Sequence, residues 1–162
     1  MTHKKLIISI VLTTLLLCLV VACKQDHSTP MATPSTSIES EQEALVLDTF
    51  STFPPEIDGC SCYFSNDSIE FKNKEYIYMN DYAQISFLKI NGEMVKFTEV
   101  YTKQVDSLRT QAKYRSDAYE MTIEVQLIKQ NGYETSLESG TLKVTDHNGS
   151  TITKPFYGEC GC

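Results

Sequence analysis

The region from residue 44 to the C-terminus predicts a single all-β domain of about eight to nine antiparallel strands, closed by disulfides. Three observations predict this class. Stretches of β-rich, alternating sequence fill the region, Asn-Gly dipeptides separate them, and two Cys-x-Cys units, Cys60-Ser61-Cys62 and Cys160-Gly161-Cys162, stand near its two ends.

The Asn-Gly dipeptides mark hairpin tips. Asn91-Gly92, Asn131-Gly132 and Asn148-Gly149 each lie between β-rich segments. Asn and Gly tolerate the positive φ angles that both central residues of a type I′ turn require. Each dipeptide therefore predicts a tight hairpin.

Alternation indicates which faces point inward. Every second residue is apolar from Met121 to Leu127, and Leu142 and Val144 repeat the pattern. This period of two places one strand face on a core and the other in water. The expected strands lie near residues 45–50, 60–65, 68–72, 75–79, 83–90, 93–102, 119–130, 133–145 and 150–157.

Two expected strands contain disruptive residues. Ser139-Gly140 predicts a bulge or a break in the eighth strand. Pro155 lacks an N–H, so it predicts that the ninth strand lies at an edge or beside a bulge.

The segment from Gln104 to Asp117 does not fit the strand pattern. Val105, Leu108 and Ala112 show a partial helical spacing, but the segment is mostly polar and equally resembles a long loop. Long connections in compact domains are often functional. A partner site and a solvated excursion are both open interpretations.

The predicted strands follow one another through short turns, which builds an antiparallel meander. Such a meander closes either as a two-sheet sandwich or as a small up-and-down barrel. The sequence leaves this choice open.

Residues 1–22 have the layout of a secretory signal peptide. A basic start is followed by an apolar run from Leu6 to Val21 and by Ala22-Cys23. The run is shorter than the about 20 residues that a spanning helix needs. A cleaved signal is therefore favoured over a permanent membrane helix.

The ending Leu19 to Cys23 resembles the lipobox of bacterial lipoproteins, in which a small residue precedes an acylated cysteine. The resemblance implies palmitate-type lipid attachment at Cys23 and anchorage in a membrane. Lys24 replaces the aspartate of an inner-membrane retention signal, which implies the outer membrane of a Gram-negative bacterium, on either its periplasmic or its surface face. Residues 23–43 then form a lipidated, disordered tether, and the β domain spans 44–162.

The excess of acidic over basic residues indicates which classes of binding partner are favoured. The chain has 14 basic and 21 acidic residues, and Lys4 and Lys5 belong to the predicted leader. Such a surface disfavours nucleic acid and favours cationic proteins or divalent ions, although solubility alone also accounts for it.

Four cysteines remain to form disulfides in the mature chain that the sequence predicts. Cys18 is lost with the leader and Cys23 takes the lipid. The cysteines that remain to pair are Cys60, Cys62, Cys160 and Cys162.

Residues i and i+2 of a strand share a face, so the two Cys-x-Cys units can pair in register. Antiparallel neighbours give Cys60–Cys162 with Cys62–Cys160, whereas parallel neighbours give Cys60–Cys160 with Cys62–Cys162. We favour the antiparallel pairing, because non-hydrogen-bonded antiparallel partners come close enough for a disulfide.

Metal and redox chemistry are the rival interpretations of the cysteines. Four thiolates suit Zn²⁺ or Cu(I), and Cys160-Gly161-Cys162 could serve as an active dithiol. An oxidising envelope favours disulfides, and no histidine stands near either unit. We expect no metal and no cofactor.

Catalytic motifs are not recognisable in this sequence. His27 lies in the tether and His147 beside a predicted turn. Tyr76, Tyr78 and Tyr82 offer a glycan or peptide surface, although aromatic residues in strands usually serve packing.

These patterns predict a non-catalytic, lipid-anchored protein of the cell envelope, with a binding or structural role toward a protein or glycan and not toward nucleic acid. One alternative is an inhibitor of a cationic, envelope-directed enzyme such as a lysozyme. The other is soft-metal binding through the two Cys-x-Cys pairs. The identity of the partner and the oligomeric state are not predicted.

Overall fold

The computed structural model of the protein describes residues 44–162. The predicted signal peptide and the whole of the predicted tether, residues 23–43 with Cys23, lie outside the described residues. The described elements are β1 Leu47–Asp48, β2 Ser61–Ser65, α2 Ser68–Asn73, β3 Tyr78–Asn80, β4 Ile85–Ile90, β5 Glu93–Gln104, β6 Arg109–Arg115, β7 Tyr119–Gln130, β8 Thr135–Asp146 and β9 Thr151–Gly161.

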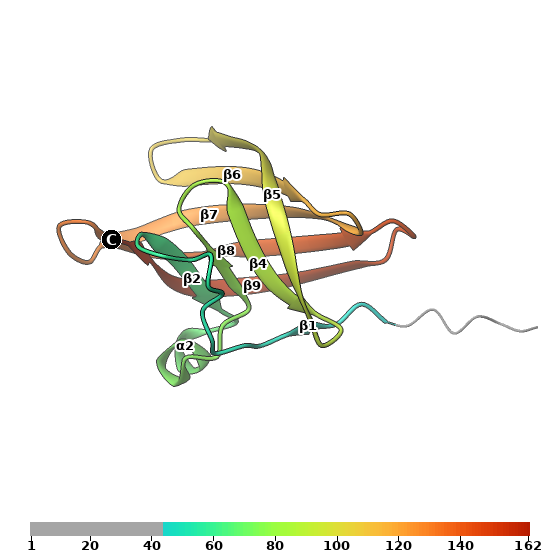
Figure 1. Ribbon diagram of the computed structural model, residues 1–162. Coiled ribbons are helices and arrows are strands. Elements are labelled where there is room, and N and C mark those ends of the chain that lie inside the picture. The colour runs from blue at the N-terminus through green and yellow to red at the C-terminus, as the bar shows by residue number, and fades with distance from the viewer. Residues whose placement is uncertain (1–43) are drawn as a thin grey trace, which may run out of the picture. The chain divides into compact units, whose positions relative to one another are not determined.

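Strands β2 to β9 form a closed antiparallel barrel of eight strands (Figure 1). Each strand pairs with the next along the chain, and β9 closes the barrel by pairing with β2. The extra strand β1 pairs with the end of β4 that β3 leaves free. The predicted all-β class is confirmed, and the closure is that of an up-and-down barrel and not of a sandwich.

Alternating side chains of the long strands fill the barrel. Met121 and Ile123 of β7 and Leu142 and Val144 of β8 are at most 2% exposed, which confirms their predicted inward face. Near them the ring of Phe64 stacks on that of Phe156, with centroids 4.4 Å apart. The interior is therefore a packed core over most of its length.

All three Asn-Gly dipeptides lie at hairpin connections. Only Asn91-Gly92, between β4 and β5, has two positive φ angles, 48° and 82°, as a type I′ turn requires. In Asn148-Gly149 only the glycine has a positive φ, and in Asn131-Gly132 neither residue does. The hairpins are confirmed, but the turn type is right at one of the three because the other connections are longer.

The predicted strand at residues 68–72 is wrong, because helix α2 stands there. The carboxylate of Asp67 caps the helix by accepting hydrogen bonds from the N–H groups of Ile69 and Glu70, at 2.7 and 3.0 Å. Glu70 in turn accepts from the backbone N–H and the side-chain amide of Asn66. The spacing of Asp67 and Glu70 is that of a capping box, but Glu70 bonds to Asn66, the residue before the N-cap.

A second apolar cluster explains why β3 is apolar on both faces. Phe71 of α2 stacks on Tyr63 of β2, and Tyr76 and Phe53 meet Tyr63 edge-on. Tyr76, Met79 and Phe50 form this cluster on the outside of the barrel wall, with Tyr63 and Phe71 packed against them. The wall is therefore buried from both sides in this region.

The segment Gln104–Asp117 is neither a loop nor a helix. It contains the end of β5, a short hairpin tip and β6, which pairs with both β5 and β7. Only Ala112 and Tyr114 of β6 are buried. The strand was missed because its outer face is polar and it has only these two apolar residues on its inner face.

The predicted bulge at Ser139-Gly140 is also wrong. β8 pairs continuously with β9, and the register shift lies in β7 between Leu127 and Lys129. Pro155 does take an edge-like position, because it pairs with Thr141 of β8 but precedes Tyr157, the first residue of β9 that pairs with β2. Within residues 44–162, no helix has the length and apolar character needed to cross a membrane.

Two disulfides fasten the barrel where β9 meets β2. They join Cys60 to Cys162 and Cys62 to Cys160, at sequence separations of 102 and 98. Cys62 stands directly opposite Cys160 in the β2–β9 ladder. The predicted antiparallel pairing is confirmed.

The two bridges close almost the same loop, so we expect their stabilising effects not to add. Cys60→Ala/Cys162→Ala should lower the free energy of unfolding by less than about 1 kcal/mol, and removal of all four cysteines by about 4–5 kcal/mol. Urea unfolding followed by circular dichroism measures both, with Cys62→Ala/Cys160→Ala as the matched variant. Two equal losses that sum to the total would contradict this expectation.

Candidate functional site

The barrel has a cavity of about 310 Å³ at the end where the chain terminates. Its wall includes Thr102 of β5, Thr110 of β6, Val125 of β7 and the Cys62–Cys160 disulfide. Figure 1 shows the C-terminus and the β5–β6 and β7–β8 connections at this same end of the strands. A pocket in the mouth of a small barrel is a usual place for a ligand.

The inner end of the cavity is aromatic. Phe64, Tyr78 and Tyr114 all line it, and each is at most 4% exposed. The rings of Phe64 and Tyr78 are stacked, and those of Tyr78 and Tyr114 meet edge-on. The cavity therefore presents flat apolar surfaces to anything that enters it.

Burial keeps the two tyrosine hydroxyls protonated. The pKa of Tyr78 lies well above the ordinary value, because burial and the neighbouring Tyr114 oppose its ionisation. The pKa of Tyr114 is also raised, chiefly by burial, with smaller contributions from the negative charges of Glu99 and Asp81. Both hydroxyls are hydrogen-bonding groups near neutral pH, and neither is a base.

Asn80 connects the cavity wall to the β3–β4 loop. Its side-chain oxygen accepts hydrogen bonds from the N–H of Cys62, at 3.0 Å, and from that of Tyr82, at 3.1 Å. Tyr82 has a φ of 62° and is 54% exposed at the cavity. The loop thus places one exposed aromatic side chain at the opening.

Glu138 is the distinctive polar residue of this cavity. It lies on β8 in the same alternation as Leu142 and Val144, so it faces inward. The hydroxyl of Ser136 donates to its Oε1 at 2.9 Å, and the Sγ of Cys160 lies 3.1 Å from its Oε2. Burial raises the pKa of this carboxyl, and the Ser136 hydrogen bond only partly opposes that rise.

Among the described residues, no cationic side chain neutralises the negative charge of the Glu138 carboxylate. Glu99 is the second carboxylate of the lining, and the lining residues include no lysine, arginine or histidine. Glu138 also takes part in none of the ion pairs within residues 44–162. The cavity therefore carries negative charge that the described part of the protein does not neutralise.

The predicted disulfide residues lie in the wall of this cavity and next to it. Cys62 and Cys160 line it, and their bond forms part of its surface. Cys160 and Cys162 are bonded to different partners, so they do not form a dithiol with each other. The sulfur atoms of Cys62 and Cys160 lie within 4.8 Å of a Glu138 oxygen, but as a disulfide they are not the thiolates that a soft metal requires.

The other candidate residues from the sequence lie in different parts of the structure. Tyr76 is buried in the outer apolar cluster, whereas Tyr78 and Tyr82 both line the cavity, Tyr78 as a buried residue and Tyr82 as an exposed one. His147 lies at the β8–β9 turn, where its Nδ1 is 3.1 Å from the carbonyl oxygen of Ala118. That turn is at the opposite end of β8 from Glu138.

Sequence reasoning missed Glu138, although a signal for it exists. The expected strand at 133–145 already had Leu142 and Val144 pointing inward. Extending the same period of two places Ser136 and Glu138 on the inner face, where a carboxylate is unusual. An acidic residue in phase with a buried apolar pair was the available indication.

Comparison of the chain with known protein families, with curated proteins and with solved structures found no match.

The raised pKa of Glu138 makes a testable statement about stability. A carboxyl whose folded pKa is raised favours folding at low pH and loses that contribution as pH rises through the folded pKa. Glu138→Gln should therefore raise the thermal midpoint near pH 7.5 and give almost no change near pH 3.5, where the native carboxyl is neutral.

Differential scanning calorimetry at the two pH values measures this difference. The matched control is Glu124→Gln, which removes an exposed carboxylate from the outer face of β7 and should leave the midpoint nearly unchanged. A lower midpoint for Glu138→Gln near neutral pH would show that the carboxylate is already compensated.

Proposed function

We propose that the protein is a non-catalytic binding protein of the cell envelope, and that the mouth of its barrel holds a ligand group that carries positive charge. The observation that supports this proposal is the uncompensated Glu138 carboxylate facing an open cavity. Removing a charge from water without a partner is costly. A cationic ligand group would supply the partner.

The remainder of the lining suits such a group. The aromatic faces of Tyr82 and Tyr114 attract cations through their ring electrons, and Phe64 offers contact to an apolar stem. The side chains of lysine and arginine combine an apolar stem with a charged end. The ligand class that we propose is therefore an alkylammonium or alkylguanidinium group.

The titratable groups of the cavity fit binding better than catalysis. Tyr78 and Tyr114 have raised pKa values and stay protonated near neutral pH. Glu138 has Ser136 as its hydrogen-bond donor and no histidine or lysine beside it in the lining. We therefore propose that this site recognises a ligand and does not catalyse a reaction.

Location in the envelope rests on the sequence and on the disulfides. Two disulfides suit an oxidising compartment outside the cytoplasm. The lipobox-type ending Leu19 to Cys23 supports an acyl anchor on Cys23. We propose outer-membrane attachment on that basis, with the β domain held away from the bilayer by the tether.

Glu138 supplies the most direct test of ligand binding. n-Butylguanidinium should bind the purified protein, and Glu138→Gln should weaken that binding at least tenfold, because a charge-assisted hydrogen bond is lost. Affinity should also fall as pH is lowered, since protonation removes the charge of Glu138, and the fall should start above the range of an ordinary glutamate.

Isothermal titration calorimetry and chemical-shift titration measure these affinities, with Glu124→Gln as the control. Equal affinity in wild type and Glu138→Gln would contradict the proposed site. Absence of saturable binding to wild type would contradict the proposed function.

The anchor has a separate test. Cys23→Ser should abolish lipidation, so that the protein is no longer processed as a lipoprotein and is lost from the membrane fraction. Metabolic labelling with palmitate and membrane fractionation report the two effects. Unchanged labelling and fractionation would refute the lipid anchor and would leave the proposed binding site in the cavity unaffected.

A further inference from the structure

The β5–β6 hairpin tip is an exposed apolar element beside the cavity. Val105 and Leu108 at this tip are 51% and 52% exposed. They lie within three residues of Thr102 and Thr110, which are part of the cavity wall. At about 3.3 Å per residue along a strand, the tip is within about 10 Å of the wall.

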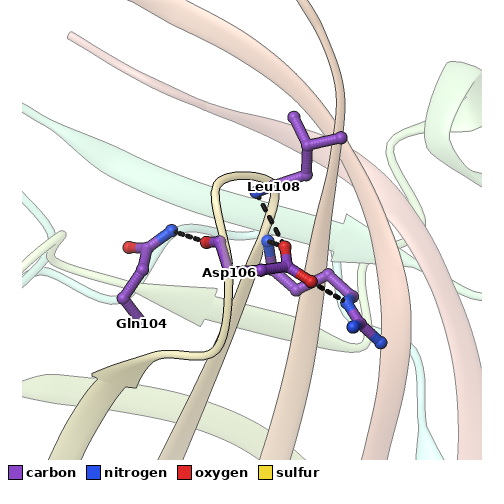
Figure 2. A network of polar contacts seen from close by, with 4 residues as sticks. Gln104, Asp106 and Leu108 are labelled. Atoms are coloured by element: carbon purple, nitrogen blue, oxygen red, sulfur yellow. Dashed lines mark hydrogen bonds and ion pairs between the residues drawn. The ribbon is translucent and has the colours of Figure 1, made fainter.

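Polar contacts hold this tip in one conformation (Figure 2). The carboxylate of Asp106 accepts hydrogen bonds from the N–H groups of Leu108 and Arg109, both at 2.9 Å, and pairs with the Arg109 side chain at 2.7 Å. The side-chain amide of Gln104 donates to the carbonyl oxygen of Asp106. The Leu108 N–H and the Arg109 side chain lower the pKa of Asp106 below its ordinary value, so the cap persists into mildly acidic solution.

A backbone hydrogen bond ties the tip to the barrel. The N–H of Leu127 in β7 donates to the carbonyl oxygen of Leu108 at 2.8 Å. A surface that is ordered before binding loses less conformational entropy when a partner arrives. The tip therefore offers two apolar side chains in a fixed place next to a negatively charged cavity.

We propose that the occupant of the barrel mouth is a protein partner, which inserts an exposed lysine or arginine side chain into the cavity and packs apolar residues beside it against Val105 and Leu108. This inference rests on the proposed function. A small cation would use the cavity alone and would leave the tip without a role.

Charge complementarity supports a basic partner. The lining carries Glu99 and Glu138 and no cationic residue, and the whole chain has a formal net charge of −7. An anchored buried group surrounded by apolar contacts is the usual arrangement of an interface hot spot, and the net charge would speed the encounter with a cationic protein. Cationic enzymes such as lysozymes fall in this class of partner.

Three five-residue peptides separate the contributions of the cavity and the tip. Ac-Leu-Ala-Arg-Ala-Leu-NH₂ carries the guanidinium with apolar flanks, a second peptide replaces both leucines with serine, and a third replaces the arginine with glutamine. In calorimetric titrations of the purified protein, the first peptide should bind about tenfold tighter than either of the others.

Substitutions in the protein then show which contact produces each increase in peptide affinity. Val105→Ser/Leu108→Ser should remove the advantage of the leucine flanks and leave n-butylguanidinium affinity unchanged, whereas Glu138→Gln should remove the advantage of the arginine. The matched control is Ile69→Ser/Met94→Ser, which removes two apolar side chains of similar exposure, one on α2 and one at the opposite end of β5.

The outcomes are distinguishable. If n-butylguanidinium binds but the leucine flanks add nothing, or if their advantage survives Val105→Ser/Leu108→Ser, the protein-partner inference is wrong and the proposed function stands. If neither n-butylguanidinium nor the arginine peptides bind wild type, both are wrong.

Discussion

The pairing of β2 with β9 is the constraint on which the rest of the structure depends. The chain up to β9 is an open meander, and its last strand must return to the first barrel strand to close it. The register that places Cys62 opposite Cys160 fixes both disulfides at once. Because these bonds close loops of about 100 residues, they restrict the unfolded chain far more than the folded barrel.

Closure also creates the chemistry of the barrel mouth. Once β9 lies between β2 and β8, the Cys62–Cys160 disulfide forms one wall and Glu138 of β8 is partly buried beside it. A partly buried carboxylate without a cation reduces stability, which is a common property of binding sites before their ligand is present. Closure of the barrel therefore produces the partly desolvated carboxylate on which the proposed binding site depends.

The sequence indicated those features whose signals are local. The two Cys-x-Cys units can pair in one register, and the closer approach of antiparallel partners then predicted which disulfides form. Strand β6, Arg109–Arg115, was missed because its stability comes from pairing with β5 and β7, which no local pattern records. Asp67 and Glu70 are a local signal for the start of helix α2. The spacing of Glu138 from Leu142 and Val144 is a local signal that Glu138 faces inward. Both features could therefore have been predicted from the sequence. The cavity itself could not be predicted, since it arises from the closure of strands distant in the chain.

The pKa of the Glu138 carboxyl, measured by carbon-detected NMR with and without saturating n-butylguanidinium, tests whether this carboxylate binds the cationic group. We expect a pKa above that of an ordinary glutamate in the free protein and a clear decrease of this pKa on saturation, because the bound cation favours the charged form. An ordinary value in the free protein, or a value that saturation does not change, would contradict it.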